Sequence, residues 1–471
     1  MKSFRSLHPY SVDVYLCLFL FCGLTLSFAG HGSFVDENLI IQTVESLTTR
    51  GELTVTQMFQ ALPGSDGKYY SRYGVSFPLL LTPFYLLGHG LNWIFPHTYA
   101  FFMNPHFFMM LWGNLLITVF TGWMFYRLCL LNGGSVSTSA LLSTALIFAT
   151  PFWPYSQTLF RLTASCAALL IVLFFVTKAI RAPSRLSLAV IGGTTALGLN
   201  LREDLVLGFM AMGVYVLCCA KGRARWTTAL SLILGAIAGF LIWGWHNWIR
   251  FDSFFIENYE DLSFDYPIVL SLPQLLVGLR RGLSTYAPLS LLLPLSFGAA
   301  KRRGRLNMWL LCASIISAYL LLYGKSSMWH GGVCWGPRHM YFLLPFCFLP
   351  GIWLLGDLSS RMKRWFVGIA FFLGMLMNFP GVYSHQGKYQ DFFASPSFFS
   401  LLMKPVIHLE YITFDELDLW WIRMIKMNPV SLWPIALAVM IGLTVWALHR
   451  LIQAVRLAEQ SDEMISKVER L

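Results

Sequence analysis

The chain has 471 residues, of which 56% are hydrophobic and 12% are charged, and its formal net charge is +11. Soluble domains carry about 25% charged residues, so this composition excludes an ordinary soluble enzyme and indicates a multi-pass helical membrane protein. The positive charge suits basic cytoplasmic loops, and the sequence has no nucleic-acid-binding motif. Its nine cysteines form no CxxC pair, which predicts buried thiols rather than a zinc site or a disulfide framework.

Apolar segments alternate with basic clusters, and together they predict how the chain crosses the membrane. Because cytoplasmic loops collect Lys and Arg, we assign the clusters at 2–5, 178–185, 221–225, 301–305, 361–364 and beyond 449 to the inner side. Between the later clusters lie four pairs of apolar segments: 186–201 with 205–220, 227–248 with 283–299, 307–323 with 341–357, and 365–383 with 431–449. The first segment, 11–29, is long enough to span, which favours an uncleaved anchor over a cleaved signal peptide.

The first segment leads to the outer side, so the cluster at 178–185 lies inside only if an odd number of the following segments cross the membrane. One of these segments therefore does not cross. Four apolar segments lie there, at 77–95, 103–126, 137–153 and 162–178. Pro78 and Pro83 disfavour a straight spanning helix over 77–95, so we predict a re-entrant or interfacial segment on the outer face. The fold class is therefore all-α, a polytopic membrane bundle with about 12 transmembrane helices and both ends in the cytoplasm.

Outward-facing regions are expected to build one site. They are residues 30–102, 152–161, 200–204, 249–282 and 323–340. We divide the chain into a transmembrane catalytic module, 1–383, and a C-terminal part, 384–471. The second part comprises an outer-face loop over 384–430 with surface helices, the last transmembrane helix and a charged helical tail over 456–471.

Asp36 and Glu37 follow closely after the first apolar segment, so both carboxylates lie near the membrane boundary. Glycosyl transfer from a lipid phosphate needs a base that takes the proton of the attacking hydroxyl, and we predict Asp36 for this role. Adjacent residues of a helix point about 100° apart, so only one of the two is expected to face the site. Alternatively, both carboxylates cap the helix predicted over 38–48.

The segment Lys68-Tyr69-Tyr70-Ser71-Arg72-Tyr73-Gly74 offers two cations and three tyrosines before the proline-broken segment. We predict that Lys68, Arg72 and Tyr73 contact donor or acceptor, although such residues are also ordinary interfacial anchors. Arg161 opens a helix at its outer end and is a further candidate for phosphate binding, whereas His246 is expected to be a satisfied interfacial histidine.

Arg202-Glu203-Asp204 forms a short charged turn between two apolar segments. Charges this close to lipid are costly unless they are paired or functional, so we predict that Arg202 and Asp204 bind substrate. A self-satisfied Arg–carboxylate turn is the alternative.

The last candidate segment runs from Lys325 to His339 and contains Trp335-Gly336-Pro337-Arg338. Tryptophan suits a sugar ring or a polyprenyl chain, and the planar fork of Arg338 fits phosphate oxygens. An aromatic belt with one anchoring arginine would show the same pattern. His330 and His339 are possible metal ligands, but no metal-binding motif surrounds them.

These motifs resemble a known family. The stretch Phe34-Val35-Asp36-Glu37, continuing through Glu45-Ser46-Leu47 and Arg50-Gly51, together with Tyr70-Ser71-Arg72-Tyr73-Gly74 and Trp335-Gly336-Pro337-Arg338, looks like the GT-C superfamily of polyprenyl-phosphate-dependent glycosyltransferases. The likeness is to its bacterial family-39-like members. Relatives include the protein O-mannosyltransferases and the lipid A aminoarabinose transferases.

The resemblance implies that Asp36 is the base, that the donor is a sugar on polyprenyl phosphate, and that transfer inverts the anomeric carbon. It also implies amphipathic helices in the first outer loop and, as in some relatives, a divalent metal ion near the acidic pair. Relatives that carry a second acidic residue after Phe152-Trp153-Pro154-Tyr155 differ from this chain, where Arg161 follows instead.

We therefore expect a multi-pass glycosyltransferase of the bacterial inner membrane with its active site on the periplasmic face. It would transfer a sugar from a polyprenyl-phosphate donor to a hydroxyl-bearing acceptor, which is a cell-envelope glycan, lipid or protein. The alternatives are a transporter or flippase for lipid-linked sugars, which would place charges near the middle of the bilayer, and a polysaccharide polymerase or ligase.

Overall fold

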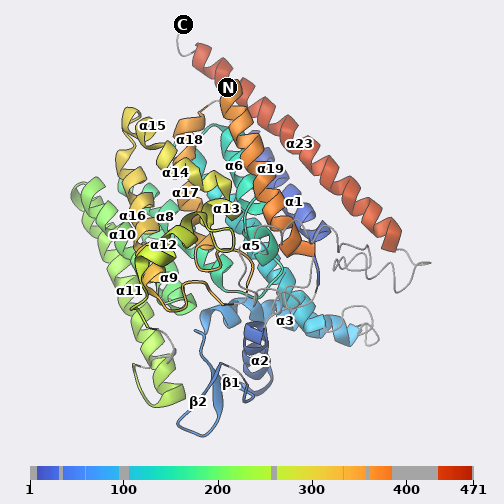
Figure 1. Ribbon diagram of the computed structural model, residues 1–471, viewed down its shortest axis with the longest axis vertical. Coiled ribbons are helices and arrows are strands. Elements are labelled where there is room, and N and C mark those ends of the chain that lie inside the picture. Colours follow the sequence, from blue (N-terminus) through green and yellow to red (C-terminus); the bar gives the residue numbers. More distant parts are fainter. Residues whose placement is uncertain are drawn as a thin grey trace.

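The computed structural model describes residues 8–30, 35–58, 60–94, 105–255, 263–332, 334–356, 360–383 and 433–468. Within these residues the chain forms a helical bundle with a small three-stranded sheet at one end (Figure 1). The surface helices predicted over 384–430 lie outside the described residues.

The helices are α1 (His8–Leu26), α2 (Val35–Arg50), α3 (Ser76–Ile94), α5 (Pro105–Leu131), α6 (Val136–Phe148), α7 (Phe152–Tyr155), α8 (Leu162–Arg181), α9 (Arg185–Leu201), α10 (Leu205–Cys219), α11 (Gly222–Phe251), α12 (Ile268–Val277), α13 (Leu283–Tyr286), η2 (Pro288–Leu291), α14 (Leu292–Leu295), α15 (Phe297–Arg302), α16 (Leu306–Lys325), η3 (Tyr341–Leu343), α17 (Leu344–Phe348), α18 (Gly351–Leu355), α19 (Arg361–Tyr383) and α23 (Trp433–Val468). The strands are β1 (Thr54–Val55), β2 (Ala61–Pro63) and β3 (Tyr69–Ser71).

The predicted all-α membrane fold is confirmed. Among the described residues, six helices are long and apolar enough to cross a membrane, and shorter apolar helices accompany them. Two predicted spans, 283–299 and 341–357, are instead chains of short helical turns, because Pro288, Pro294, Pro345 and Pro350 interrupt them. The predicted helical tail is, as far as Val468, the continuation of the last apolar helix, since α23 runs for 36 residues.

Helix α3 corresponds to the segment predicted over 77–95. It has 19 residues with Pro83 inside, and it is not among the six helices that are long and apolar enough to span. In Figure 1 it runs away from the bundle near the end that carries the sheet. Leu86, Leu87 and Trp93 remain exposed on it.

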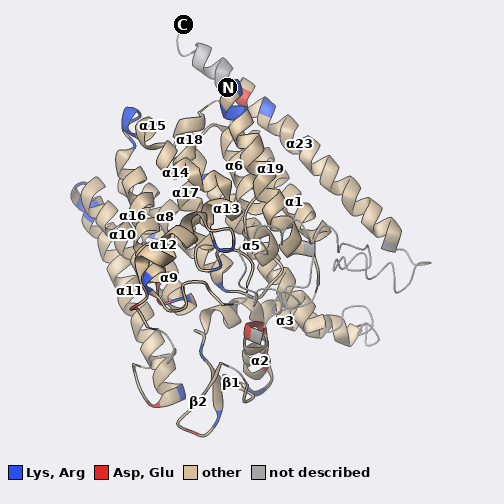
Figure 2. Ribbon diagram, in the orientation of Figure 1, with Lys and Arg blue, Asp and Glu red and all other residues tan. Residues whose placement is uncertain are grey.

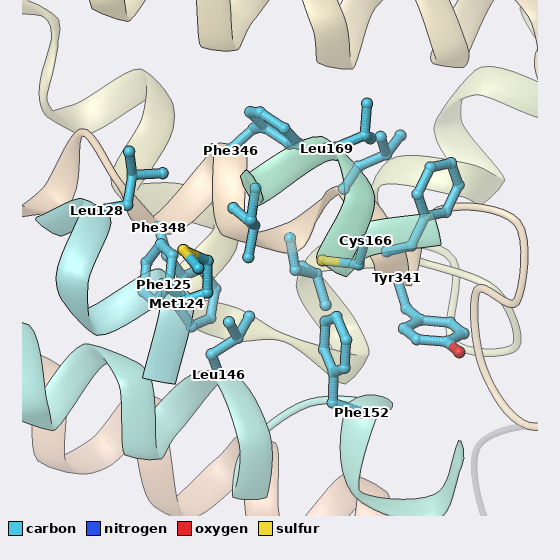
Figure 3. Packing of buried hydrophobic residues seen from close by; sticks show 14 of the residues in the cluster. Met124, Phe125, Leu128, Leu146, Phe152, Cys166, Leu169, Tyr341, Phe346 and Phe348 are labelled. Carbon is cyan, nitrogen blue, oxygen red and sulfur yellow. The ribbon is translucent and has the colours of Figure 1, made fainter. Parts of the chain in front are cut away.

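The core lies where α5, α6, α8 and α17 meet (Figure 3). Phe125 and Leu128 of α5, Leu146 of α6 and Phe346 of α17 are fully buried there. Elsewhere α9 and α11 approach through glycines, since a Cβ at Gly235 would collide with the backbone carbonyl of Gly192. This close packing holds α9 against α11, and the candidate site includes Trp243 of α11 and the turn that follows α9.

The two ends of the bundle differ in charge (Figure 2). At one end the basic loops converge: Arg181 donates to the carbonyl of Leu131 at the end of α5, and the guanidinium groups of Arg303 and Arg305 approach Gly356 and Gly133. Helix α2, the sheet and the candidate site lie toward the other end.

The sheet has the antiparallel order β1-β3-β2, with Tyr70 opposite Thr54 on one side and Leu62 on the other. It is fastened to the last turn of α11 by Arg250, a buried side chain that donates to the carbonyl of Ser71 at 2.5 Å. Strands of two or three residues are too short for an alternating pattern, so the sequence did not predict them.

Candidate active site

A cavity of about 540 Å³ opens among the helix ends on the side of the sheet. Each of the five regions predicted to build the site contributes to its wall. The lining residues with polar or aromatic side chains are Asp36, Gln60, Arg72, Tyr73, Phe160, Arg161, Arg202, Glu203, Asp204, Trp243, Phe264, Tyr323, Ser326, Arg338 and His339. Four of these are arginines and three are carboxylates, so the wall carries a small excess of positive charge.

Asp36 and Arg338 form an ion pair across the cavity wall, although they are far apart in the sequence. Nη2 of Arg338 donates to Oδ2 of Asp36 at 2.5 Å, and the side chains are only 19% and 14% exposed. The guanidinium also lies 3.9 Å from the ring centroid of Phe160. The ring limits the directions that Arg338 can take, so the pair is held from two sides.

The ionisation of Asp36 is set by opposing influences. Burial raises the pKa of the carboxyl group, but the charge and hydrogen bond of Arg338, a hydrogen bond from Tyr73 and the charge of Arg161 outweigh it and lower the pKa below its ordinary value. Asp36 is therefore an ionised carboxylate at neutral pH. It can accept a proton, and it faces a cavity large enough for a sugar.

Glu37 points away from the cavity. Its Oε1 accepts a hydrogen bond from the backbone amide of Leu159 at 2.8 Å, and the residue is 1% exposed. The two neighbouring carboxylates therefore have different surroundings, as expected for adjacent helical positions. Glu37 holds the loop that carries Phe160 and Arg161.

Tyr73 lies between Arg161 and Gln60. The guanidinium of Arg161 is 4.6 Å from the Tyr73 ring centroid, and the Tyr73 hydroxyl donates to Oε1 of Gln60 at 2.9 Å. Arg161 itself donates to the carbonyl of Leu201 at 2.9 Å. Gly74 follows Tyr73 in the sequence and lies against the backbone of Asn200. A Cβ at Gly74 would collide with the carbonyl oxygen of Asn200. This contact fixes the Arg72–Tyr73 segment against the end of α9.

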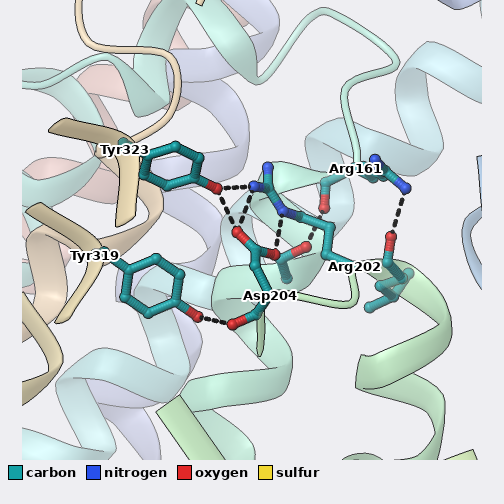
Figure 4. A network of polar contacts seen from close by, with 7 residues as sticks. Arg161, Arg202, Asp204, Tyr319 and Tyr323 are labelled. Atoms are coloured by element: carbon teal, nitrogen blue, oxygen red, sulfur yellow. Dashed lines mark hydrogen bonds and ion pairs between the residues drawn. The ribbon is translucent and has the colours of Figure 1, made fainter. Parts of the chain in front are cut away.

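Arg202 and Asp204 form a second ion pair in the cavity wall (Figure 4). Nε and Nη2 of Arg202 donate to the two carboxylate oxygens at 2.9 and 2.7 Å. The Tyr323 hydroxyl contacts both partners, and the Tyr319 hydroxyl donates to the Asp204 carbonyl at 2.8 Å. Burial raises the pKa of Asp204, but the charge of Arg202 and the hydrogen bonds from Arg202 and Tyr323 outweigh it and lower the pKa. The turn is thus self-satisfied and also faces the cavity.

His339 stacks on Tyr323, with ring centroids 4.6 Å apart. Burial, followed by the charges of Arg202 and Arg338, lowers its pKa well below the ordinary value. The imidazole is therefore neutral at physiological pH.

The loop that carries Arg338 is organised by Arg281, which the sequence analysis did not identify. This fully buried guanidinium donates to the carbonyls of Gly332, Cys334 and Gly336 at 2.5, 2.6 and 2.9 Å. Tyr155 adds a hydrogen bond to the Trp335 carbonyl at 2.8 Å. In the sequence, two adjacent arginines, Arg280 and Arg281, beside a broken apolar segment could have drawn attention to this position. Nothing in the sequence indicated which carbonyl groups Arg281 would bind.

Some predicted site residues do not line the cavity. Lys68 is on the outside of the sheet, where it forms a half-exposed ion pair with Glu52 at 3.0 Å. Trp335 is buried against Tyr286, with ring centroids 5.9 Å apart, and it packs on Gly381. His246, which was expected to be a satisfied interfacial histidine and not a site residue, is buried in α11, and its Nδ1 has no hydrogen-bond partner among the described residues.

A divalent metal does not fit the donor set of the described site. No group of three or more His, Cys, Asp or Glu side chains could hold an ion within the described ranges. The Asp36 carboxylate is instead paired with the guanidinium of Arg338.

Comparisons with known proteins identify the fold. No family model and no curated protein sequence matches the chain. Among solved structures, it is similar to the crystal structure of ArnT from Cupriavidus metallidurans in the apo state, with a TM-score of 0.53 and 14% sequence identity. The alignment covers 93% of this chain and 75% of ArnT. This likeness shows the fold and supports the predicted resemblance.

Proposed function

Since the chain has the polytopic fold of ArnT, an aminoarabinose transferase of the GT-C superfamily, we propose that it is an inverting membrane glycosyltransferase. It moves a sugar from a polyprenyl-phosphate donor to a hydroxyl group of a cell-envelope glycan, lipid or protein. The observation that carries this proposal is the ionised Asp36 carboxylate, paired with Arg338, in the wall of a cavity with four arginines.

In the proposed reaction, Asp36 accepts the proton of the acceptor hydroxyl while the oxygen attacks the anomeric carbon of the donor sugar. The bond between that carbon and the phosphate oxygen breaks, and the electron pair leaves with the polyprenyl phosphate. Attack from the face opposite the phosphate inverts the configuration. The low pKa of Asp36 keeps it ionised before the reaction, and the proton moves as the hydroxyl oxygen becomes acidic in the transition state.

Arginines of the cavity would hold the departing phosphate. Arg338 and Arg202 each use one edge of the guanidinium for a carboxylate, and a planar guanidinium can bind phosphate with its other donors. Arg72 and Arg161 add positive charge to the same wall. Tyr73 and Asp204 would contact substrate from the cavity wall. The positions of Lys68 and Trp335 give them no direct role in this proposal.

The charge distribution supports activity on the periplasmic face of a bacterial inner membrane. Loops rich in Lys and Arg stay in the cytoplasm, and these loops gather at one end of the bundle (Figure 2). The cavity lies toward the opposite end. A polyprenyl-phosphate donor and an acceptor outside the cytoplasm would both reach it there.

The proposal is tested by reconstitution. Purified wild type, Asp36→Asn and Glu45→Gln are placed in vesicles with radiolabelled polyprenyl-phosphate sugars and a membrane extract as acceptor. Glu45 is an exposed acid of the same helix and serves as the control. We expect wild type and Glu45→Gln to transfer label, and Asp36→Asn to lose about 10²- to 10⁴-fold in rate, the usual contribution of a general base.

Two results would contradict the proposal. Full activity of Asp36→Asn would remove Asp36 as the base. Movement of labelled lipid across sealed vesicles without any new glycosidic bond would favour a flippase.

A further inference from the structure

Glu203 is the third carboxylate of the cavity wall, and its surroundings differ from those of the other two. Asp36 is paired with Arg338. Asp204 is paired with Arg202. Glu203 is an exposed residue that lines the same cavity, and within the described part of the chain it forms no ion pair with Lys or Arg. A carboxylate that no cation of the wall occupies is open to a ligand in the cavity.

The polar contact of Glu203 is with Trp243 of α11. Nε1 of Trp243 donates to Oε1 of Glu203 at 3.2 Å, and Trp243 also lines the cavity. A carboxylate has about four acceptor positions on its two oxygens, and the indole occupies one of them. The remaining positions can accept hydroxyl groups of a ligand while the contact with Trp243 is kept.

The Trp243 ring is held in place by other aromatic side chains. Phe240 stacks on it with ring centroids 5.8 Å apart. Phe254 and Phe255 approach it at an angle, with centroids 6.5 and 6.3 Å away. These contacts fix the orientation of the indole, so its apolar surface beside Glu203 is formed before a ligand arrives.

We infer, on the basis of the proposed function, that Trp243 and Glu203 form the subsite that binds the sugar of the donor. A sugar ring presents C–H groups, which pack on an aromatic ring, and hydroxyl groups, which donate to a carboxylate. This pair of side chains offers a partner for both kinds of surface. Trp335, which the sequence suggested for the sugar, is buried against Tyr286 instead.

The position of Glu203 in the chain favours the sugar of the donor over that of an acceptor. Glu203 directly follows Arg202, one of the arginines proposed to hold the phosphate of the donor. The sugar is bonded to that phosphate, so it lies within reach of the next residue. Arg202 then binds the phosphate, and Glu203 binds the group attached to it.

Tryptophans near a membrane boundary are also ordinary interfacial anchors, and α11 contains two that fit this description. Trp245 and Trp248 are exposed and lie outside the cavity wall. Trp243 differs from both because it lines the cavity and donates to a carboxylate there. Trp245 therefore supplies a matched control on the same helix.

The test measures binding, which does not require transfer. Purified wild type, Glu203→Gln, Trp243→Phe and Trp245→Phe are titrated with two radiolabelled lipids. One is the polyprenyl-phosphate sugar that wild type binds most tightly, and the other is polyprenyl phosphate without a sugar. Glu203→Gln keeps an oxygen for the indole N–H but removes the charge, and Trp243→Phe keeps an aromatic ring. Thermal unfolding of the same samples shows that the variants are folded.

We expect the Kd for the sugar-bearing lipid to rise about 5- to 10-fold in Glu203→Gln, because a hydrogen bond to a charged acceptor is roughly twice as strong as one to a neutral acceptor. In Trp243→Phe it should rise about 3- to 10-fold, because a smaller ring covers less of the sugar. The Kd for polyprenyl phosphate should stay within about 2-fold of wild type in both variants, since neither residue contacts the phosphate. Trp245→Phe should bind both lipids as wild type does.

Three results would overturn the inference. The first is an unchanged Kd for the sugar-bearing lipid in Glu203→Gln. The second is an equal loss for both lipids, which would show that the two residues support the wall and do not contact the sugar. The third is a wild type that binds both lipids equally well. A wild type that prefers the sugar-bearing lipid but forms no glycosidic bond would contradict the proposed function alone.

Discussion

Oε1 of Glu37 accepts a hydrogen bond from the backbone amide of Leu159 at 2.8 Å, although Glu37 is the immediate neighbour of the carboxylate that faces the cavity. The contact joins the first turn of α2 to the loop before α8. Phe160, which packs on the guanidinium of Arg338, follows directly. Glu37 therefore supports the position of Asp36 through this loop, because Phe160 packs on the arginine that pairs with Asp36.

Replacing Glu37 should lower the stability of the protein and weaken its binding of the donor. Glu37→Ala leaves the buried amide of Leu159 without this acceptor, which costs about 1–3 kcal/mol, and it loosens Phe160, so donor KM should rise. Glu37→Gln keeps an acceptor oxygen and should lose less. Thermal unfolding in detergent and donor titrations measure both effects. An alanine variant as stable as wild type would show that the contact contributes nothing.

Arg281 should be required for the loop that carries Arg338. Arg281→Met leaves three buried carbonyls without their donor, and we expect unfolding to become easier by about 3–5 kcal/mol. Arg281→Lys keeps the charge but lacks the planar fork, so its loss should be intermediate. The control is Arg223→Met at an exposed position of the basic end, whose stability should remain within about 0.5 kcal/mol of wild type. Equal stability of Arg281→Met and Arg223→Met would refute this role.

Gly74→Ala should displace the Arg72–Tyr73 segment. The added Cβ would meet the carbonyl of Asn200, whose side chain is tied to Ala196 and Gly239 at 3.1 and 2.9 Å, so the backbone there cannot yield easily. We expect a loss of about 1–3 kcal/mol in stability and lower transfer. Gly90→Ala is the matched control: outside the neighbouring backbone of its own helix, no atom lies within 4 Å of the Cβ that alanine would add, and in helix α3 the substitution should be neutral or stabilising. Similar melting temperatures for both variants would argue against the predicted clash.

His339 should make the protein less stable in acid. Its pKa in the folded state is far below the ordinary value, so below about pH 6.5 the unfolded chain binds a proton that the folded chain does not. The free energy of unfolding must then fall as pH decreases from about 6.5, and it levels off above that pH. His339→Phe keeps an aromatic ring beside Tyr323 and should show a smaller decrease between pH 7 and 5 in thermal unfolding. Parallel curves for the two proteins would exclude His339 as the source.

Much of the fold could be predicted from hydropathy. The expected segments at 162–178 and 307–323 correspond to α8 (Leu162–Arg181) and α16 (Leu306–Lys325) within a few residues, because lipid requires a long apolar helix with every backbone group satisfied. The segments 283–299 and 341–357 were predicted as continuous spans. Hydropathy counts apolar residues without regard to the prolines that interrupt the hydrogen bonds of a helix.

The site was predictable only in part. Arg72, Arg202 and Arg338 stood out because charged residues beside apolar segments are conspicuous. The pairing of Asp36 with Arg338 joins positions 302 residues apart, and no local pattern encodes it. Arg281 was missed for the same reason, because its importance comes from carbonyl groups that only the folded chain brings together.

Arg250 fastens the sheet to the end of α11, and α11 has 30 residues. At about 1.5 Å per residue, that helix is roughly 45 Å long, more than the hydrocarbon thickness of about 30 Å. A helix whose apolar stretch exceeds the hydrocarbon thickness tilts or protrudes, and the sheet would follow α11 because Arg250 attaches it. The height of Tyr73 above the lipid would then depend on how the apolar part of α11 matches the bilayer. Lipids with shorter or longer acyl chains would change how the cavity meets a donor whose phosphate is fixed at the membrane surface.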